Sequence, residues 1–280
     1  MIDAYLDESG IHDGAAVCVI AGFFGGRGQW KKFEILWRKT LSDFGVPLEK
    51  FHAKDVIKRG GFFRGWPDDR QSLFMTKLSE AITTFKIHPV SVGVVVADFQ
   101  ACSHPQRRFL TGARLDNGKL VMSGAPNKPY FCPFQECIIK VLDYTPVGGK
   151  AHFFFGLDRT FYEYATSFMK GLQEDGYTEQ HARIGTSAYP LAKETPELQA
   201  ADFFAYLTYL DMLERLTKNA WKQRPPDLLG SLLIRARSSD DFQYYEKTAM
   251  AEIFNRTYRK SGNWDGHDEV PINPERDNPL

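Results

Sequence analysis

The sequence lacks the features that most readily assign a chain to a functional class. Its 35 Lys and Arg residues balance 35 Asp and Glu residues, so bulk charge provides no attraction to nucleic acid or to a membrane surface. The four cysteines include no C-x-x-C pair and no histidine cluster accompanies them, which argues against a zinc site and a disulfide scaffold. We therefore expect reduced packing cysteines at Cys18, Cys102, Cys132 and Cys137.

Long hydrophobic runs, targeting signals and internal repeats are also missing. The first apolar run, residues 15–24, has no basic lead-in and is too short to cross a membrane. The chain has 280 residues, of which 43% are hydrophobic, so it can bury a sizeable core. We expect a soluble cytoplasmic protein with no membrane partner.

Hydrophobic periodicity predicts an α/β protein. Alternation predicts a strand at residues 2–6 and a nearly continuous apolar run predicts one at 15–24, joined to the first as an antiparallel hairpin. Helical spacing follows at 29–44. The remaining predictions are helices at 68–85, 133–144, 161–174, 195–219 and 242–258, and strands at 88–97, 151–158 and 182–184. Interleaved strands and helices favour a mixed sheet with antiparallel opening strands and helices on both faces.

No linker divides the chain cleanly, so we expect one domain over residues 1–260. The connection at about residues 98–130 exceeds ordinary loop lengths and reads as an insertion. Residues 261–280 are polar and rich in Pro and Asn, which predicts a mobile tail.

One carboxylate stands out because its surroundings are apolar. The segment 198–210 is hydrophobic nearly all round, and Asp202 has Leu198, Ala205 and Tyr206 at helical contact positions. An unpaired buried carboxylate costs several kcal/mol, so a positive group must lie beside it. That group is either an internal hydrogen-bond or ion-pair partner, or a metal ion.

Two further acids follow predicted strands: Asp7, with Glu8 beside it, and Asp158. Ligands of open α/β sheets gather at strand ends, although a single terminal Asp often only caps a turn. Several carboxylates brought together repel each other unless a divalent cation neutralises them. Oxygen ligands without Cys or a His cluster favour Mg²⁺ or Mn²⁺, and two such ions support phosphoryl transfer.

Three motifs together resemble the bacterial proteins of the domain of unknown function 3800 family. They are YLDESG at residues 5–10, FHAKD at 51–55 and LQAADFFAY at 198–206, and the likeness covers roughly residues 3–215. The resemblance implies a ribonuclease H-like fold, a mixed five-stranded sheet whose first three strands are antiparallel. It also implies metal ligands at Asp7, Asp158 and Asp202, with Glu8 in the same opening motif.

The resemblance leaves the auxiliary residues less defined. His52 and Asp55 match a His-x-x-Asp motif, in which His52 orients a water or binds phosphate, unless it is only a capping or packing histidine. Ribonuclease H-like enzymes often take a further Glu from the first helix, and Glu34 is the candidate, without a motif around it. Glu194 and Glu197 are reserve ligands before the last core helix.

Local charge suggests where a nucleic acid could bind. Residues 27–70, which include Lys54, hold eleven Lys or Arg against six Asp or Glu. The insertion carries basic residues beside Phe109 and Tyr130, which we expect to be exposed, a mixture typical of single-strand binding. Those basic residues are Arg107, Arg108, Arg114, Lys119 and Lys128. The alternative is a solvated charged face.

The leading hypothesis is a nuclease that uses Mg²⁺ or Mn²⁺, two ions in a carboxylate cluster, to hydrolyse phosphodiester bonds of DNA or RNA. Asp7, Asp158 and Asp202 would bind the metal and Glu8 would assist. A non-catalytic binding or regulatory module, in phage defence or a mobile element, is the rival. A metal-dependent nucleotide phosphohydrolase is the third hypothesis.

Overall fold

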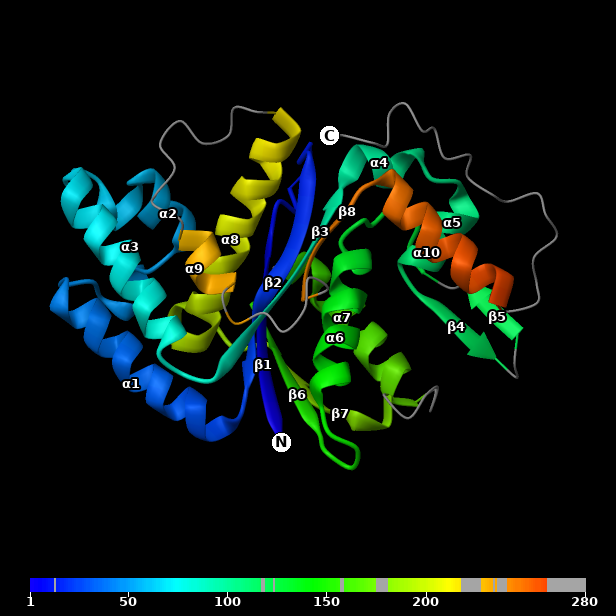
Figure 1. Cartoon of the computed structure of the whole chain (residues 1–280), viewed down its shortest axis with the longest axis horizontal. Helices are drawn as coiled ribbons and strands as arrows, with labels where there is room; N and C mark the ends of the chain where they lie inside the picture. The colour runs from blue at the N-terminus through cyan, green and yellow to red at the C-terminus, as the bar shows by residue number, and fades with distance from the viewer. Residues whose placement is uncertain are drawn as a thin grey trace.

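The structure is a computed structural model that describes most of the chain. The described residues are 1–12, 14–116, 119–122, 124–156, 159–174, 181–217, 228–233, 235 and 241–260. They form an α/β fold in which a twisted sheet lies between two groups of helices (Figure 1). Among the described residues, no helix combines the length and the apolar character needed to cross a membrane.

The sheet is mixed, with the strand order β7-β6-β1-β2-β3-β8 among the described residues. Its strands are β1 (Ile2–Ser9), β2 (Val17–Gly25), β3 (Ile87–Val95), β6 (Ala151–Phe155), β7 (Ile184–Ala188) and β8 (Phe242–Tyr245). β1 pairs antiparallel with β2 and β2 antiparallel with β3, while β6, β7 and β8 run parallel to their neighbours. The opening hairpin and the antiparallel first three strands are confirmed, and β8 adds a sixth strand.

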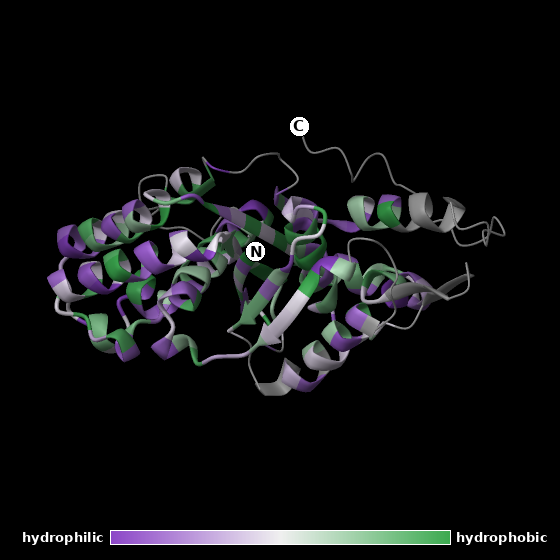
Figure 2. Cartoon of the chain, turned by 90° about the horizontal axis from the view of Figure 1, so that it is seen from below, coloured by the Kyte–Doolittle hydropathy of each residue, from purple (hydrophilic) through white to green (hydrophobic). Residues whose placement is uncertain are grey.

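Helices cover both faces of the sheet, as expected. One face is covered by α1 (Arg27–Asp43), α2 (Ala53–Lys58), α3 (Asp68–Thr83), α8 (Pro196–Thr217) and α9 (Leu228–Leu233) (Figure 1). The other is covered by α4 (Val96–Ala101), α5 (His104–Leu110), α6 (Phe131–Tyr144), α7 (Arg159–Glu174) and α10 (Lys247–Lys260). The sheet between them is the most hydrophobic part of the chain, whereas the outer helices alternate hydrophilic and hydrophobic residues (Figure 2).

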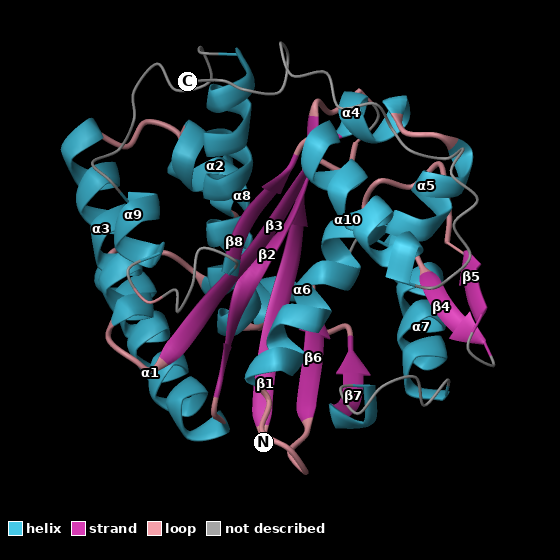
Figure 3. Cartoon of the chain, turned by 45° about the vertical axis from the view of Figure 1, so that its right-hand side comes forward, coloured by secondary structure: helices cyan, strands magenta, loops and turns pink. Residues whose placement is uncertain are grey.

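The carboxyl ends of β1, β3 and β6 lie together at one end of the sheet, because these strands point the same way (Figure 3). We call this end, where the strands stop, the carboxyl edge. The β1–β2 turn lies at the same edge, and α4 begins there directly after β3. This edge is where ligands of open α/β sheets bind.

Two sequence predictions require correction. The helix expected over residues 242–258 is strand β8 followed by helix α10, and the N–H of Lys247 at the start of α10 donates to Asp98 (3.1 Å). The segment 51–55, expected only to link two helices, contains the start of α2. Six residues are too few to produce a readable helical period.

The predicted insertion contains α4, α5 and a small hairpin of β4 (Ala113–Asp116) and β5 (Lys119–Met122). A capping box starts α5, since Ser103 accepts from the N–H of Gln106 and the Gln106 side chain accepts from the N–H of Ser103. The predicted tail, residues 261–280, lies outside the described residues.

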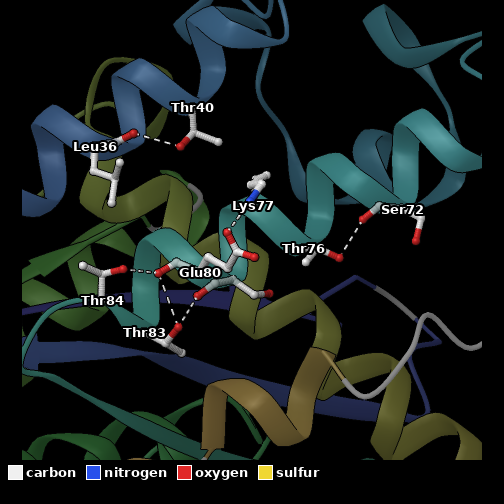
Figure 4. A network of polar contacts seen from close by, with 9 residues as sticks. Leu36, Thr40, Ser72, Thr76, Lys77, Glu80, Thr83 and Thr84 are labelled. Carbon is white, nitrogen blue, oxygen red and sulfur yellow. Dashed lines mark hydrogen bonds and ion pairs between the residues drawn. The ribbon is translucent and has the colours of Figure 1, made fainter.

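Several polar side chains of the outer helices α1 and α3 bond within their own helix. The hydroxyls of Thr40, Thr76 and Thr84 donate to carbonyls four residues earlier, at 2.7–2.9 Å (Figure 4). Lys77 pairs with Glu80 at 2.7 Å on the exposed side of α3. These groups are satisfied within their own helices, so the candidate site must be sought elsewhere.

Candidate functional site

Asp7 is buried at the end of β1, on the face covered by α8. Only 6% of the residue is exposed, and Tyr5, two positions earlier on the same face, packs in the core beneath α8. The N–H of Glu8 donates to Oδ1 of Asp7 (2.9 Å), which is the local backbone contact of a turn-forming aspartate. Burial, then Glu8 and Asp202, raise the pKa of Asp7 well above its usual range.

Asp202 reaches the same edge from α8, the helix that packs across β1 and β2. Nearly every neighbour on α8 is buried, as the apolar sequence predicts, while Asp202 keeps part of its surface open. The backbone N–H of Ala53, at the start of α2, donates to Oδ2 of Asp202 (2.8 Å). Burial raises the pKa of Asp202, and His52 and this N–H partly counter it.

Asp7, which is buried, and Asp202, which is partly exposed, therefore form an acidic pair, and two further acids add negative charge to it while His52 opposes them. The charge of Glu8 raises the pKa of Asp7, and the charge of Asp55 raises the pKa of Asp202. Glu8 also acts on Cys18 and Tyr130, which belong to the core on the opposite face of the sheet. Glu8 thus lies at the sheet edge between the two faces.

The His-x-x-Asp motif lies beside this acidic pair. His52 immediately precedes α2, and its Nδ1 lies 3.4 Å from Oδ2 of Asp55. Its side chain is 55% exposed and makes no capping hydrogen bond, so neither the packing nor the capping interpretation holds. An exposed imidazole close to Asp202 is free to contact a ligand.

Gly156 packs directly against the carboxylate of Asp7, and no local sequence signal predicts this role. A Cβ at this position would lie 2.7 Å from Oδ1 of Asp7, and the N–H of Gly156 donates to the carbonyl of Leu6 (3.0 Å). Only glycine lets β6 end this close to the carboxylate. Asp158, the third predicted ligand, follows two residues later and lies outside the described residues.

Of the reserve ligands, Glu197 belongs to a separate acidic group with Glu34 and Asp3, near the amino end of β1. Glu197 is 8% exposed, and burial followed by Glu34 raises its pKa to about 7, with Asp3 adding to the shift and Arg38 opposing it. Glu194 is exposed in the turn before α8. The structure therefore brings Glu34 and Glu197 together, away from the Asp7–Asp202 pair.

The basic residues predicted to contact nucleic acid are distributed over two regions. Lys54 is exposed in the first turn of α2, next to Ala53. Arg108 is exposed and Arg107 partly exposed on α5, whereas the side chains of Arg114 and Lys119 are outside the described ones. Phe109 and Tyr130 were expected at the surface and are instead 7% and 2% exposed, because both pack in the core.

The donor set at this edge suits a hard divalent cation, although the described part of the site is incomplete. Its side chains offer carboxylate oxygens, and the nearby Cys18 thiol is buried with a raised pKa. Among the described residues, no group of three or more His, Cys, Asp or Glu side chains is arranged to hold a metal ion. A complete site needs a ligand such as Asp158.

Comparisons with protein-family models, with curated proteins and with solved structures find no match to this chain. The resemblance of its three motifs to a known family accordingly stays a prediction.

Proposed function

We propose that this protein is a divalent-metal-dependent nuclease with a ribonuclease H-like fold. It hydrolyses a phosphodiester and leaves a 5′-phosphate. The observation that carries the proposal is the Asp7–Asp202 pair, in which buried Asp7 has Glu8 and Asp202 as its most influential charged neighbours, while Asp202 is countered only in part by His52 and the N–H of Ala53. Such a pair is costly without a cation, which is the reason to expect one here.

The strand order supports the fold assignment. Leaving out β8, the order β3-β2-β1-β6-β7 with three antiparallel strands followed by two parallel ones agrees with the sheet that the resemblance implies. In this assignment the central strand β1 supplies one carboxylate and the helix across it supplies another.

The proposed metal ligands are Asp7, Asp202 and Asp158, with Glu8 assisting. Two Mg²⁺ or Mn²⁺ ions held there would activate a water and stabilise the leaving oxygen of the phosphodiester. The N–H of Ala53 fixes one oxygen of Asp202 and leaves the other for a ligand. The exposed ring of His52, oriented by Asp55, is placed to hydrogen-bond a phosphate oxygen or a water.

The proposed partner is DNA or RNA, approached along the edge that carries α2 and α4. Lys54 on α2 would neutralise backbone phosphate close to the acidic pair, and Arg107 and Arg108 would extend the contact along the insertion. Since the whole chain has no net charge, this attraction is local.

The first test is metal binding and cleavage by Asp7→Asn and Asp202→Asn. Mn²⁺ should raise the Tm of the wild-type protein, and each variant should lose that rise, because a neutral amide is a poorer ligand. Cleavage of labelled single- and double-stranded DNA and RNA should fall at least about 100-fold, since a lost ligand misplaces the ion.

Matched controls exist on the same two elements. Asp3→Asn alters a buried aspartate of β1 that pairs with Arg27, and Asp211→Asn alters one of α8 that pairs with Arg215. Both should destabilise the protein while keeping the Mn²⁺-dependent Tm rise. No binding at millimolar Mn²⁺ would contradict the metal site. Binding without cleavage of any nucleic acid, but with hydrolysis of a nucleotide, would favour the phosphohydrolase; binding with no hydrolysis at all would favour the non-catalytic module.

A further inference from the structure

A cavity of about 380 Å³ opens at the same edge of the sheet as the acidic pair, on the opposite face. We call it the hairpin pocket. Its walls come from residues 10–12 and 14–16 of the β1–β2 turn, the start of α4 with Val96, Ala97 and Gln100, and residues 127–130 before α6. Its volume lies at the lower end of the range for small-molecule sites, so it suits one small ligand rather than a duplex.

The lining combines an apolar floor with a polar rim. Cys18 and Tyr130 are both buried and form part of the floor. The amides of Gln100 and Asn127 line the rim and are exposed, so they can donate and accept hydrogen bonds. Lys128 and His12 add an ammonium and an imidazole, and both residues are exposed. A flat heteroaromatic ring carrying a phosphate fits this combination.

The floor of the pocket is in electrostatic contact with the acidic site. After burial, Glu8 is the largest influence that raises the pKa of Tyr130, and Asp7 also contributes. Glu8 acts on Cys18 in the same direction. Gly10 of the pocket wall follows Asp7 by three residues, which span at most about 11 Å of extended chain. The pocket wall at Gly10 therefore lies at most about 11 Å from Asp7.

The wall formed by the turn is held in place by a close contact. Gly10 has a φ of +75°, and a Cβ there would lie 2.2 Å from the carbonyl oxygen of Val17 and 2.6 Å from the ring of Tyr209. Glycine alone permits this approach of the turn to α8. The turn is thus held by the same helix that carries Asp202, which links the pocket to the acidic site.

We propose that the hairpin pocket binds one nucleotide of the substrate strand, next to the phosphodiester that is cleaved. The base lies on the floor of Cys18 and Tyr130 and meets the amides of Gln100 and Asn127, while its phosphate faces Lys128 and His12. This inference rests on the proposed function and specifies its substrate as single-stranded at this point, because a paired base does not enter a cavity of this size.

The test is a titration with adenosine and uridine 5′-monophosphates in metal-free buffer, followed by NMR or calorimetry. Ala97→Trp fills the pocket from an exposed position on α4, and it should raise the Kd for at least one nucleotide about tenfold or more. Ala101→Trp adds the same side chain at an exposed position of α4 outside the lining and should bind within about twofold of wild type. Gln100→Ala, which needs no extra space, should weaken binding about threefold.

The pocket assignment is overturned if the wild-type protein binds neither nucleotide at millimolar concentration, or if Ala97→Trp and Gln100→Ala both bind as well as wild type. The Mn²⁺-dependent Tm rise is measured in parallel and should be unchanged in all three variants. Loss of nucleotide binding with an intact Mn²⁺ response supports the pocket. Nucleotide binding that depends on Ala97 in a protein without any Mn²⁺ response would support the pocket and reject the metal site separately.

Discussion

At the scale of single residues, the buried aspartates of β1 and α8 differ in what neutralises them. Asp3 pairs with Arg27 at 3.2 Å, and Asp211 pairs with Arg215 at 2.8 Å and accepts from Tyr244 at 2.6 Å. The strongest influences on the pKa of Asp7, apart from burial, come from acids. A carboxylate with this environment either holds a proton or faces a cation, and this contrast separates Asp7 from the structural aspartates.

Glu197 is the residue whose charge should affect stability near neutral pH. Its pKa is about 7 in the folded protein and ordinarily 4.5, so the folded state binds the proton more tightly. The stability that this proton provides is complete below about pH 4.5 and is lost as the pH rises through about 7. We predict that Glu197→Gln gains up to about 3 kcal/mol relative to wild type between these pH values.

Urea denaturation of both proteins at about pH 4.5, 6 and 7.5 measures this difference. Glu194→Gln, in the exposed turn three residues earlier, is the control and should follow wild type at each pH. Parallel stability profiles for Glu197→Gln and wild type would mean that burial does not disfavour the charged form of Glu197.

At the scale of elements, a polar contact joins the edge strand β8 to helix α8. The hydroxyl of Tyr244 donates to Oδ2 of Asp211, and burial together with Asp211 raises the pKa of Tyr244, so the phenol keeps its proton. We predict that Tyr244→Phe costs about 1–3 kcal/mol in the free energy of unfolding, because a buried carboxylate loses a donor.

Chemical denaturation checks this cost, with Tyr162→Phe as a control on an exposed tyrosine of α7. Hydrogen exchange should become faster in β8 before it does in β1, since β8 lies at the edge of the sheet. Equal stability of Tyr244→Phe and wild type would show that the contact contributes nothing to holding β8.

Some helices and strands could be predicted from the sequence alone, and others could not. Helix α1 is recognisable because its apolar residues recur at helical spacing, and α8 and β2 because each is a long, nearly continuous apolar segment. Asp202 could be selected because it interrupts an apolar segment, and Asp7 because it lies at the end of a predicted strand. Strand β8 could not be predicted, because its four residues precede a helix and fit the helical period equally well. Only its pairing with β3 shows that these residues form a strand. Gly156 and the hairpin pocket depend on segments distant in sequence, and no local signal marks them.

At the scale of the whole molecule, the acidic site should couple metal binding, protonation and folding. Burial raises the pKa of both Asp7 and Asp202, so the metal-free protein is stabilised by protons at low pH and loses that contribution as the pH rises. Because a ligand must lose its proton to bind, we predict that Mn²⁺ affinity increases with pH, by up to about tenfold per unit for each proton released. Calorimetry at about pH 6, 7 and 8, in buffers of different ionisation enthalpy, counts those protons.

The same coupling predicts that stability falls with rising pH in the metal-free protein and that Mn²⁺ opposes this fall. Without Mn²⁺ the wild-type protein should be less stable at about pH 8 than at about pH 6, and Mn²⁺ at 100 times its Kd should add about 2.7 kcal/mol. Glu197→Gln removes the contribution of the acid whose pKa is about 7, so the acidic pair contributes to the dependence that remains. In Asp202→Asn the Mn²⁺ response should disappear at every pH. An Mn²⁺ affinity that is constant at every pH above the ordinary aspartate value of 3.8 would contradict ligands with raised pKa values, because such ligands must release protons as the ion binds.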